Sequence, residues 1–410
     1  MRKTLFFLVL LAAIVTAPEI TLAQGPIEGL AGSGSALLTG VDVVNPARLA
    51  SSGGTSVRIL GFAADASNNS FSLSDYNTYN GVDWTDQQKQ EILDKIPAAM
   101  SLHTNILLGA PSFSVGSFAF TTRARAGMLG AFPKAIFDII LNGNTPGRNF
   151  SFSTAEGSAL AIGEARLSHG RTFDFGKWGE YGIGVSLKYL YGGAYAKLEE
   201  AHGDLRTDPD QIHGQGNFLA RTALGGTGWG IDLGATREVG NDWTASFVLQ
   251  DLFSSINWTH KTKEADVQID FANGNLHSLE NGDNLADEHH NTRDIPSFKT
   301  SIPEVMTIGV ARSVGSLSYV ADWEQGFKKS NFTDTRPRMA VGAEYKGIPL
   351  LSWRAGLSAG GRDGKSVAFG LGLRPGPLRL DFSVSSRGGY LPGGGRGIGT
   401  GFSFGFGSKY

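Results

Sequence analysis

The side chains that could bind a metal ion lie in two polar stretches of the sequence. One stretch carries His289 and His290 directly after Asp287 and Glu288. The other contains Glu199, Glu200, His202, Asp204 and Asp210. Neither has a spacing that places ligands on one face of an element, as a helical His-x-x-x-His pair does. We therefore interpret both stretches as solvated loop charge and predict no metal site.

Other reaction chemistry finds little support in the sequence. The chain has no Cys, which excludes thiol and Cys-zinc chemistry. The glycine run 393–395 is not followed by a helical pattern, so it does not predict a phosphate-binding loop. No nucleophilic triad can be assigned. We predict that the protein is not an enzyme, has no catalytic residues and needs no cofactor. A net charge of −2 leaves no basic excess for nucleic acid.

The N-terminal residues indicate export. Arg2 and Lys3 precede an apolar run over residues 5–15, and Ala23 ends a small-residue cleavage site. We predict a signal peptide over residues 1–23. The apolar run is too short for a transmembrane anchor, which needs about 20 apolar residues. No later run reaches that length, so a helical inner-membrane protein is excluded.

Alternation of apolar and polar residues dominates the mature chain. In residues 378–385, for example, Leu380, Phe382 and Val384 share one face and Asp381 and Ser383 the other. The mean hydropathy of −0.10 is typical of a barrel whose lipid-facing residues are balanced by lumen-facing ones. The pattern predicts an all-β protein with a single transmembrane antiparallel β-barrel of about 14 strands. The strands of a β-sandwich also alternate apolar and polar residues, so a secreted β-sandwich binding module is the remote alternative.

The two faces of the predicted strands differ in character. On the last strand we expect four aromatic residues to face lipid: Phe402, Phe404, Phe406 and Tyr410. The residues expected to face the lumen carry charges of both signs: Arg338, Glu344, Arg354, Arg379 and Asp381. A wide ion-selective pore would favour one sign. The mixed charges therefore favour a plugged interior.

The segments between the strands include short helices and long loops. Thr85 and Gln88 form a capping box at the start of a predicted helix that Pro97 ends. A second short helix is predicted over residues 133–143, with Pro133 in its first turn. The polar stretches 199–214 and 271–299 are predicted to be large loops.

The residues before the first strand are rich in glycine. This stretch cannot form a domain of its own, so it is either a disordered tether or a plug in the barrel mouth. Asn45 and Pro46 form a rigid turn and favour the plug. We predict a plug or hatch segment over residues 24–55 and a barrel over residues 56–410.

These features resemble the FadL-type and PorV-like outer-membrane barrels. The resemblance rests on the glycine-rich mature N-terminus, the turn of Asn45, Pro46 and Ala47 before the first strand, and the number of strands. Residues 184–199 and 228–258 are closer still to an uncharacterised group of such barrels in Gram-negative envelopes. The final Tyr410 is similar to the signal read by the barrel-assembly machinery.

The resemblance implies an outer-membrane location and a functional class. It implies a channel for small hydrophobic compounds, with Asn45, Pro46 and Ala47 at the plug. The expected partners are outer-membrane lipid, the assembly machinery and a hydrophobic small molecule. The alternative is a non-transporting barrel that acts as a secretion or envelope-assembly partner.

Overall fold

The computed structural model describes residues 25–144, 146–208, 212–240, 242–270 and 287–407. The predicted signal peptide, residues 1–23, therefore lies outside the described residues, as does Tyr410. The helices are α2 Gly25–Gly29, α3 Leu73–Tyr79, α4 Asp86–Asp94 and α5 Lys134–Asn142, with 3-10 turns η1 Gly40–Asp42, η2 Pro46–Ser51, η3 Gly176–Trp178 and η4 Pro392–Gly394. The strands are β1 Thr55–Asn68, β2 Ala99–Gly109, β3 Ser112–Val115, β4 Phe118–Pro133, β5 Asn149–Ser151, β6 Glu156–Asp174, β7 Glu180–Thr207, β8 Ile212–Val239, β9 Trp243–Trp258, β10 Lys263–Asp270, β11 Asp287–Asp294, β12 Phe298–Ser301, β13 Val305–Val314, β14 Leu317–Gly326, β15 Arg338–Ile348, β16 Leu351–Gly360, β17 Gly364–Leu373, β18 Leu378–Arg387 and β19 Gly397–Gly407.

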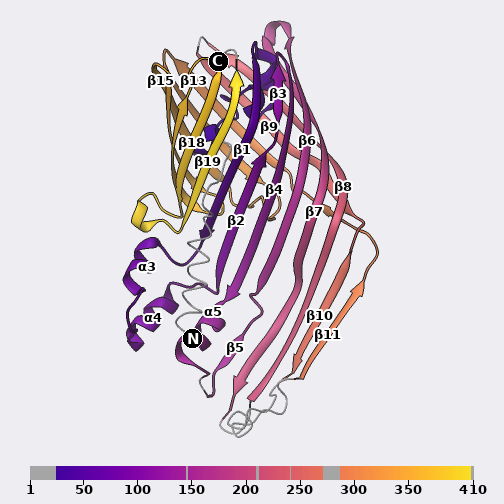
Figure 1. Cartoon of the computed structure of the whole chain (residues 1–410), viewed down its shortest axis with the longest axis vertical. Helices are drawn as coiled ribbons and strands as arrows, with labels where there is room; N and C mark the ends of the chain where they lie inside the picture. The colour runs from indigo at the N-terminus through magenta and orange to yellow at the C-terminus, as the bar shows by residue number, and fades with distance from the viewer. Residues whose placement is uncertain (1–24, 145, 209–211, 241, 271–286, 408–410) are drawn as a thin grey trace.

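The strands form one antiparallel sheet that closes on itself, because β19 pairs with β1 (Figure 1). Several strands are interrupted pieces of one wall strand. β2 and β3 both pair with β1, β5 and β6 both pair with β7, β9 and β10 both pair with β8, and β11 to β13 continue one another beside β10 and β9. Counted this way the wall has 14 strands. The predicted all-β barrel of about 14 strands is confirmed.

Closure through β1 and β19 gives both of these strands a neighbour on each side, as a membrane-spanning sheet requires. Successive side chains along each strand then point alternately to the outer and the inner face of the wall. Along β18, Phe382 and Val384 are exposed on the outside, whereas Asp381 and Ser383 are buried on the inside. On β19, Phe402, Phe404 and Phe406 alternate with buried small residues on the other face. Phe402 packs on Phe382 with ring centroids 4.7 Å apart.

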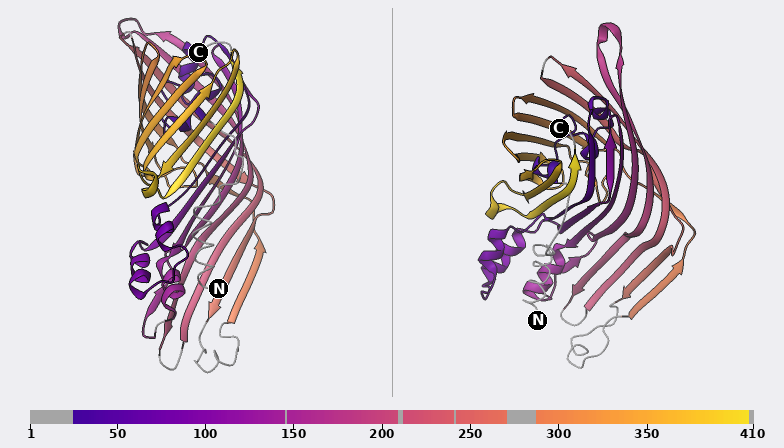
Figure 2. Two further views of the ribbon diagram at one scale, coloured as in Figure 1. Left: turned by 60° about the vertical axis from the view of Figure 1, so that its left-hand side comes forward. Right: turned by 45° about the horizontal axis from the view of Figure 1, so that its top comes forward.

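The wall is taller on one side than on the other. β4 to β8 and the β10–β11 hairpin extend far beyond the end of β13 to β19 (Figure 2). The short connections and the C-terminal end of β19 lie at one end, and the helices α3 to α5 lie at the other. Barrels of this type place short turns on the periplasmic side and long loops outside the cell. The helices and the tall extension lie at the end opposite the short turns.

The prediction of a large loop over residues 199–214 is wrong for most of that stretch. β7 and β8 run through it, and their ladder extends to the pair of Thr207 and Ile212. One face of this extension carries polar side chains, such as His202 opposite Asn217, and the other carries small or apolar ones, such as Ala201 opposite Phe218. Polarity alone therefore suggested a loop where cross-strand hydrogen bonding makes a hairpin.

The second predicted loop, residues 271–299, is also partly wrong. Residues 287–294 form β11, which pairs along its whole length with β10, and β12 begins at Phe298. His289 and His290 thus lie on a strand. The rest of the stretch, residues 271–286, lies outside the described residues.

The helices α3, α4 and α5 form a small core of their own. The predicted capping box is confirmed at α4, where the Gln88 N–H donates to the Thr85 hydroxyl and the Gln88 side chain accepts from the Thr85 N–H. The helix α5 begins at Lys134 and ends before Gly143, whose φ of 79° favours glycine. The buried residues of this core are Phe71, Tyr79, Ile92, Leu93, Ile96, Met100, Phe137 and Leu141. Among the described residues, no helix is long and apolar enough to cross a membrane.

Candidate functional site

The N-terminal segment lies against the inner faces of the wall strands. α2 packs on β17, β18 and β19, η1 packs on β1, β3 and β4, and η2 packs on β6, β7 and β8. Leu30, Ser35 and Leu49 of this segment are completely buried. The chain therefore crosses the interior from one side of the wall to the other before β1 begins.

Two kinds of wall residue make room for this segment and bind it. Glycines on the inner faces allow close approach: a Cβ on Gly184 would collide with the backbone of Ala47. Asp322 of β14 accepts hydrogen bonds from the N–H groups of Gly34 and Ser35, at 2.7 and 2.9 Å, and from the Ser35 hydroxyl at 2.7 Å. Its carboxylate thus binds a backbone turn of the segment.

Asn45 holds the last part of the segment. Its side-chain amide donates to the carbonyls of Ala235 and Phe247, at 3.1 and 3.0 Å, and to the Ser246 hydroxyl at 2.8 Å. Its carbonyl accepts the N–H of Ala47 at 2.9 Å and so caps η2, in which Pro46 is the first residue. Asn45, Pro46 and Ala47 are all buried. The short motif thus connects the segment to β8 and β9.

Replacement of Asn45 by Ala is expected to loosen this connection. It leaves buried carbonyl and hydroxyl groups of β8 and β9 without their donor, which costs about 1–3 kcal/mol. Hydrogen exchange at the amides of η2 should become faster by the corresponding factor. Ser51→Ala is the matched control, because its exposed hydroxyl makes only one bond, to Arg48 at 3.3 Å. Unchanged protection in Asn45→Ala would show that Asn45 does not hold the segment.

The charges predicted for the lumen fall into separate groups. The Arg354 guanidinium lies 2.8 Å from Glu344 and 2.6 Å from Asp381, and all three side chains are buried. Arg338 donates to the carbonyl of Ala31 in the N-terminal segment. Arg379 donates to the Gly407 carbonyl at the end of β19. The structure therefore brings three of the five predicted residues together and places two elsewhere.

Sequence reasoning did not single out the most buried ion cluster. Lys188 of β7 is completely buried, with its amine 2.6 Å from Asp232 and 2.8 Å from Asp251. The Arg166 side chain lies 3.7 Å from Asp232 and donates to the carbonyl of Val43 in the N-terminal segment. The available signal was the alternation itself, which places Lys188 and Asp232 on the face opposite the apolar one.

An apolar cluster occupies part of the same inner surface. Its buried members are Ile162, Leu190, Ala223, Ile256, Trp258 and Ile302, and Leu160, Tyr195, Phe298 and Phe332 pack against it. Leu190 stands opposite Glu164 in the ladder, so the cluster begins directly beside the buried charges. The Trp258 side chain donates to the Thr300 hydroxyl at 2.8 Å. We call these ten residues the apolar cluster.

The wall beside the apolar cluster is irregular. The register between β8 and β9 shifts twice near Ile231. In the same part of β9, Asp251 and Phe253 have φ values of 60° and 55°, which non-glycine residues in a strand rarely adopt. Phe253 is 83% exposed on the outer face. Bulges and strained residues of this kind concentrate at functional positions.

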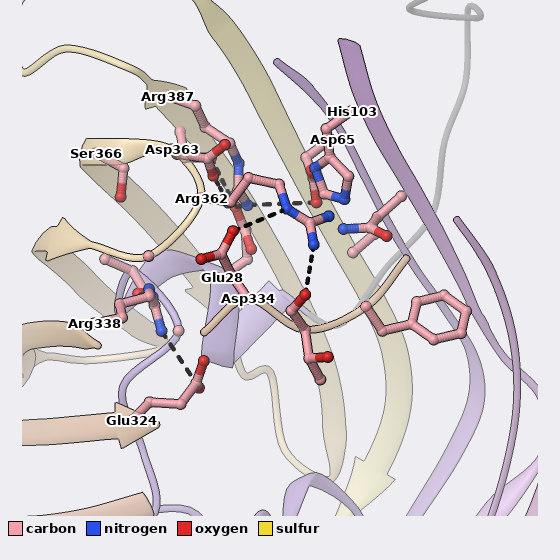
Figure 3. Close-up of a pocket in the computed structure, with 18 of the residues that line it drawn as sticks. Glu28, Asp65, His103, Glu324, Asp334, Arg338, Arg362, Asp363, Ser366 and Arg387 are labelled. Atoms are coloured by element: carbon pink, nitrogen blue, oxygen red, sulfur yellow. Dashed lines mark hydrogen bonds and ion pairs between the residues drawn. The ribbon is translucent and has the colours of Figure 1, made fainter. Parts of the chain in front are cut away.

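A cavity of about 360 Å³ lies between the N-terminal segment and the loop that connects β14 to β15. Glu28 lines it from the N-terminal side and is bound by Arg387 at 2.7 Å (Figure 3). From the loop side it is lined by Phe332 and Asp334. Burial acts to raise the pKa of Asp334, but hydrogen bonds from Arg336 and the charge of Arg362 lower it below its ordinary value. The Asp334 carboxylate therefore stays ionised and pairs with arginines.

No group of three or more His, Asp or Glu side chains is placed to hold a metal ion in the described part of the chain. Residues 356–360 match Gly-x-Ser-x-Gly, but Ser358 lies inside β16 and bonds to Ser366 at 2.6 Å. A nucleophile elbow instead needs a strand-to-helix turn.

These observations define an outer-membrane-type β-barrel whose interior is crossed by its own N-terminal segment. A family model described as a family of unknown function, DUF5723, matches residues 46–385. The chain belongs to this family. The match confirms the predicted resemblance to an uncharacterised group of barrels. Comparison with curated proteins found no match.

Solved structures with a similar fold include two toluene transporters and a FadL homologue. The toluene transporter TbuX of Ralstonia pickettii is 14% identical with a TM-score of 0.52, covering 93% of this chain and 97% of that one. The toluene transporter TodX of P. putida is 12% identical with a TM-score of 0.51, and a FadL homologue of Pseudomonas aeruginosa is 13% identical with a TM-score of 0.52. Both comparisons cover 95% of this chain and 98% of the other. At these identities the similarity establishes the fold alone.

Proposed function

We propose that the protein is an outer-membrane channel for the uptake of small hydrophobic compounds. In this proposal residues 24–55 form the plug, with Asn45, Pro46 and Ala47 as its anchor, and residues 56–410 form the barrel. The toluene transporters of similar fold support the class of solute. In this proposal the protein is not an enzyme and needs no cofactor. Its partners are outer-membrane lipid, the barrel-assembly machinery and the transported compound.

The apolar cluster is the observation that supports uptake most strongly. A barrel interior that holds only water and ions has no need of a Trp, two Phe and a Tyr on its inner face. Here Phe298 and Tyr195 pack edge to face at the extracellular side of the cluster, with ring centroids 5.4 Å apart. The opposite end of the cluster contains Ile256 and Ile302, next to the irregular stretch of β9. In this proposal a hydrophobic solute passes by parting these packed side chains, six of which are buried.

A charge placed on the apolar cluster is expected to block uptake without preventing assembly. Phe298→Asp puts a carboxylate at a half-buried position on the proposed route. Uptake of labelled toluene into cells that express the variant should fall to the level of cells without the protein. The control is Trp178→Asp, which changes an aromatic residue that is 64% exposed in a turn. Heat-modifiable gel migration verifies that both variants are folded.

The same assay separates the two candidate functions. The secretion or assembly partner gains support from the bonds that hold the N-terminal segment in place, because a fixed plug suits a scaffold. Uptake by the wild-type protein that Phe298→Asp abolishes would establish transport. No uptake by the wild-type protein would reject transport and favour the scaffold.

A further inference from the structure

The loop that connects β14 to β15, residues 327–337, has exposed ends, but its central residues 330–334 are buried or half-buried. This central part folds across the interior to the opposite wall. The Asn331 side-chain amide donates to the carbonyls of Gly127 in β4 and Ser158 in β6, and to the Ser158 hydroxyl, each at 3.1 Å. Asn331 is 7% exposed. We call residues 327–337 the crossing loop.

The crossing loop is ordered by its own contacts. The Ser330 N–H donates to the Thr333 carbonyl at 3.0 Å, and the hydroxyls of the same two residues lie 2.8 Å apart. Arg362, from the turn between β16 and β17, donates to the carbonyls of Ser330 and Thr333, each at 2.6 Å. The loop is therefore a formed structure with a defined position.

Its tip fits closely against the wall. A Cβ built on Gly127 would lie 2.9 Å from the Phe332 ring and 3.1 Å from the Asn331 Cβ, so only glycine allows the loop this position. Phe332 is the residue that the crossing loop contributes to the apolar cluster, and it also lines the 360 Å³ cavity. The Arg125 guanidinium lies over its ring, 4.7 Å from the ring centre. Phe332 thus stands between the wall residues of the apolar cluster and the cavity.

The N-terminal segment forms the opposite boundary of that cavity, through Ile27, Glu28 and Ala31. The interior is consequently crossed twice, by the N-terminal segment and by the crossing loop, with the cavity between them. We propose that the crossing loop is a second gate in series with the N-terminal plug, and that Phe332 is its stopper. A solute that arrives at the apolar cluster must displace Phe332 before it reaches the cavity. The assignment of a solute rests on the proposed function; the series arrangement of the two barriers does not.

Two barriers in series predict a non-additive result. Deletion of residues 29–44 removes the middle of the N-terminal segment. Gly127→Leu forces Asn331 and Phe332 off the wall. In planar bilayers neither variant alone should conduct ions well above the wild-type level, whereas the combination should open a water-filled channel. Gly163→Leu is the matched control on β6, because a Cβ at Gly163 meets its nearest atom only at 3.8 Å. Combined with the deletion, it should remain closed.

Each remaining outcome of the conductance experiment contradicts the proposal. Full conductance after deletion of residues 29–44 alone would show that the crossing loop is no barrier. Full conductance of Gly127→Leu alone would show that the N-terminal segment is none. A folded double variant that stays closed would reject the series arrangement. Heat-modifiable migration is measured for every variant.

A disulfide lock provides a second test that does not disturb the fit at Gly127. The chain has no Cys of its own, so Ser158→Cys with Asn331→Cys introduces a unique pair at side chains that now lie 3.1 Å apart. Oxidation should abolish toluene uptake, and a reductant should restore it. Ser313→Cys with Ser318→Cys, within the β13–β14 hairpin, is the control pair, with hydroxyls 2.9 Å apart. Uptake that persists in the oxidised lock would overturn the gate. Absence of uptake in the wild-type protein would instead reject the proposed function and leave the conductance result to decide the gate.

Discussion

Replacement of Lys188 by Met should lower the free energy of unfolding by about 3 kcal/mol. The Lys188 amine lies completely buried between Asp232 and Asp251, and its loss leaves two buried carboxylates without their closest cation. Removal of one partner from a buried ion cluster typically costs about 3–5 kcal/mol. We expect the lower end because Arg166 and Arg125 remain, at 3.7 and 4.0 Å from the two carboxylates.

Reversible folding into lipid vesicles, followed by Trp fluorescence, measures this change. The double variant Lys188→Met and Asp251→Asn is the matched control, because it removes one positive and one negative charge together. It should recover part of the lost stability. Equal stability of the single variant and the wild-type protein would mean that Lys188 is not buried among these carboxylates in the membrane.

Phe382→Arg should cost about 2–4 kcal/mol, the range for a cation at the lipid face near the middle of a membrane barrel. Phe382 lies in the middle of β18 and is exposed on the outer face. The substitution also removes its ring contact with Phe402. The same lipid-folding assay measures the effect.

A second exposed apolar residue controls for the loss of a hydrophobic side chain. Leu391 is 74% exposed in the connection between β18 and β19, outside the strands. Leu391→Arg should therefore change stability by less than about 0.5 kcal/mol. If both substitutions cost the same, the outer face of β18 does not face lipid.

The family and the geometry together narrow the function of the chain. The barrel fold is shared with toluene transporters, but at 12–14% identity the fold does not transfer a substrate. The apolar cluster of this chain is therefore what supports a hydrophobic solute. The two segments that cross the interior are what support control of passage.

The alternation of side chains was sufficient to predict the barrel and the facing of individual residues. A strand has a side-chain period of two, so every second residue lies on the same face and has the polarity that this face requires, whatever the rest of the fold is. This is why the outward position of Phe402, Phe404 and Phe406 could be read directly. Local capping rules worked for the same reason at Thr85 and Gln88, where the interacting groups are three residues apart.

Other features required the tertiary structure. The contacts of Asn45 with β8 and β9 join residues about 200 positions apart, as do those of Asn331 with Gly127. No local pattern records such pairings. The extended β7–β8 hairpin escaped prediction because its many charged residues hid a weak alternation with small residues such as Ala201 and Gly203, although the cross-strand pairing extends through them.

The sequence by itself thus determined the class of protein and the order of the strands' inner and outer residues, whereas the plug function of the N-terminal glycine-rich segment stays a prediction. Only the tertiary structure decided which charges meet, where the apolar cluster lies, and that a second segment crosses the interior. The physical reason is the separation along the chain of the residues that interact. Periodicity and capping arise from neighbours along the chain, whereas the position of Lys188 among carboxylates or of Phe332 against Gly127 arises from closure of the sheet, which brings distant strands to face one another across the interior.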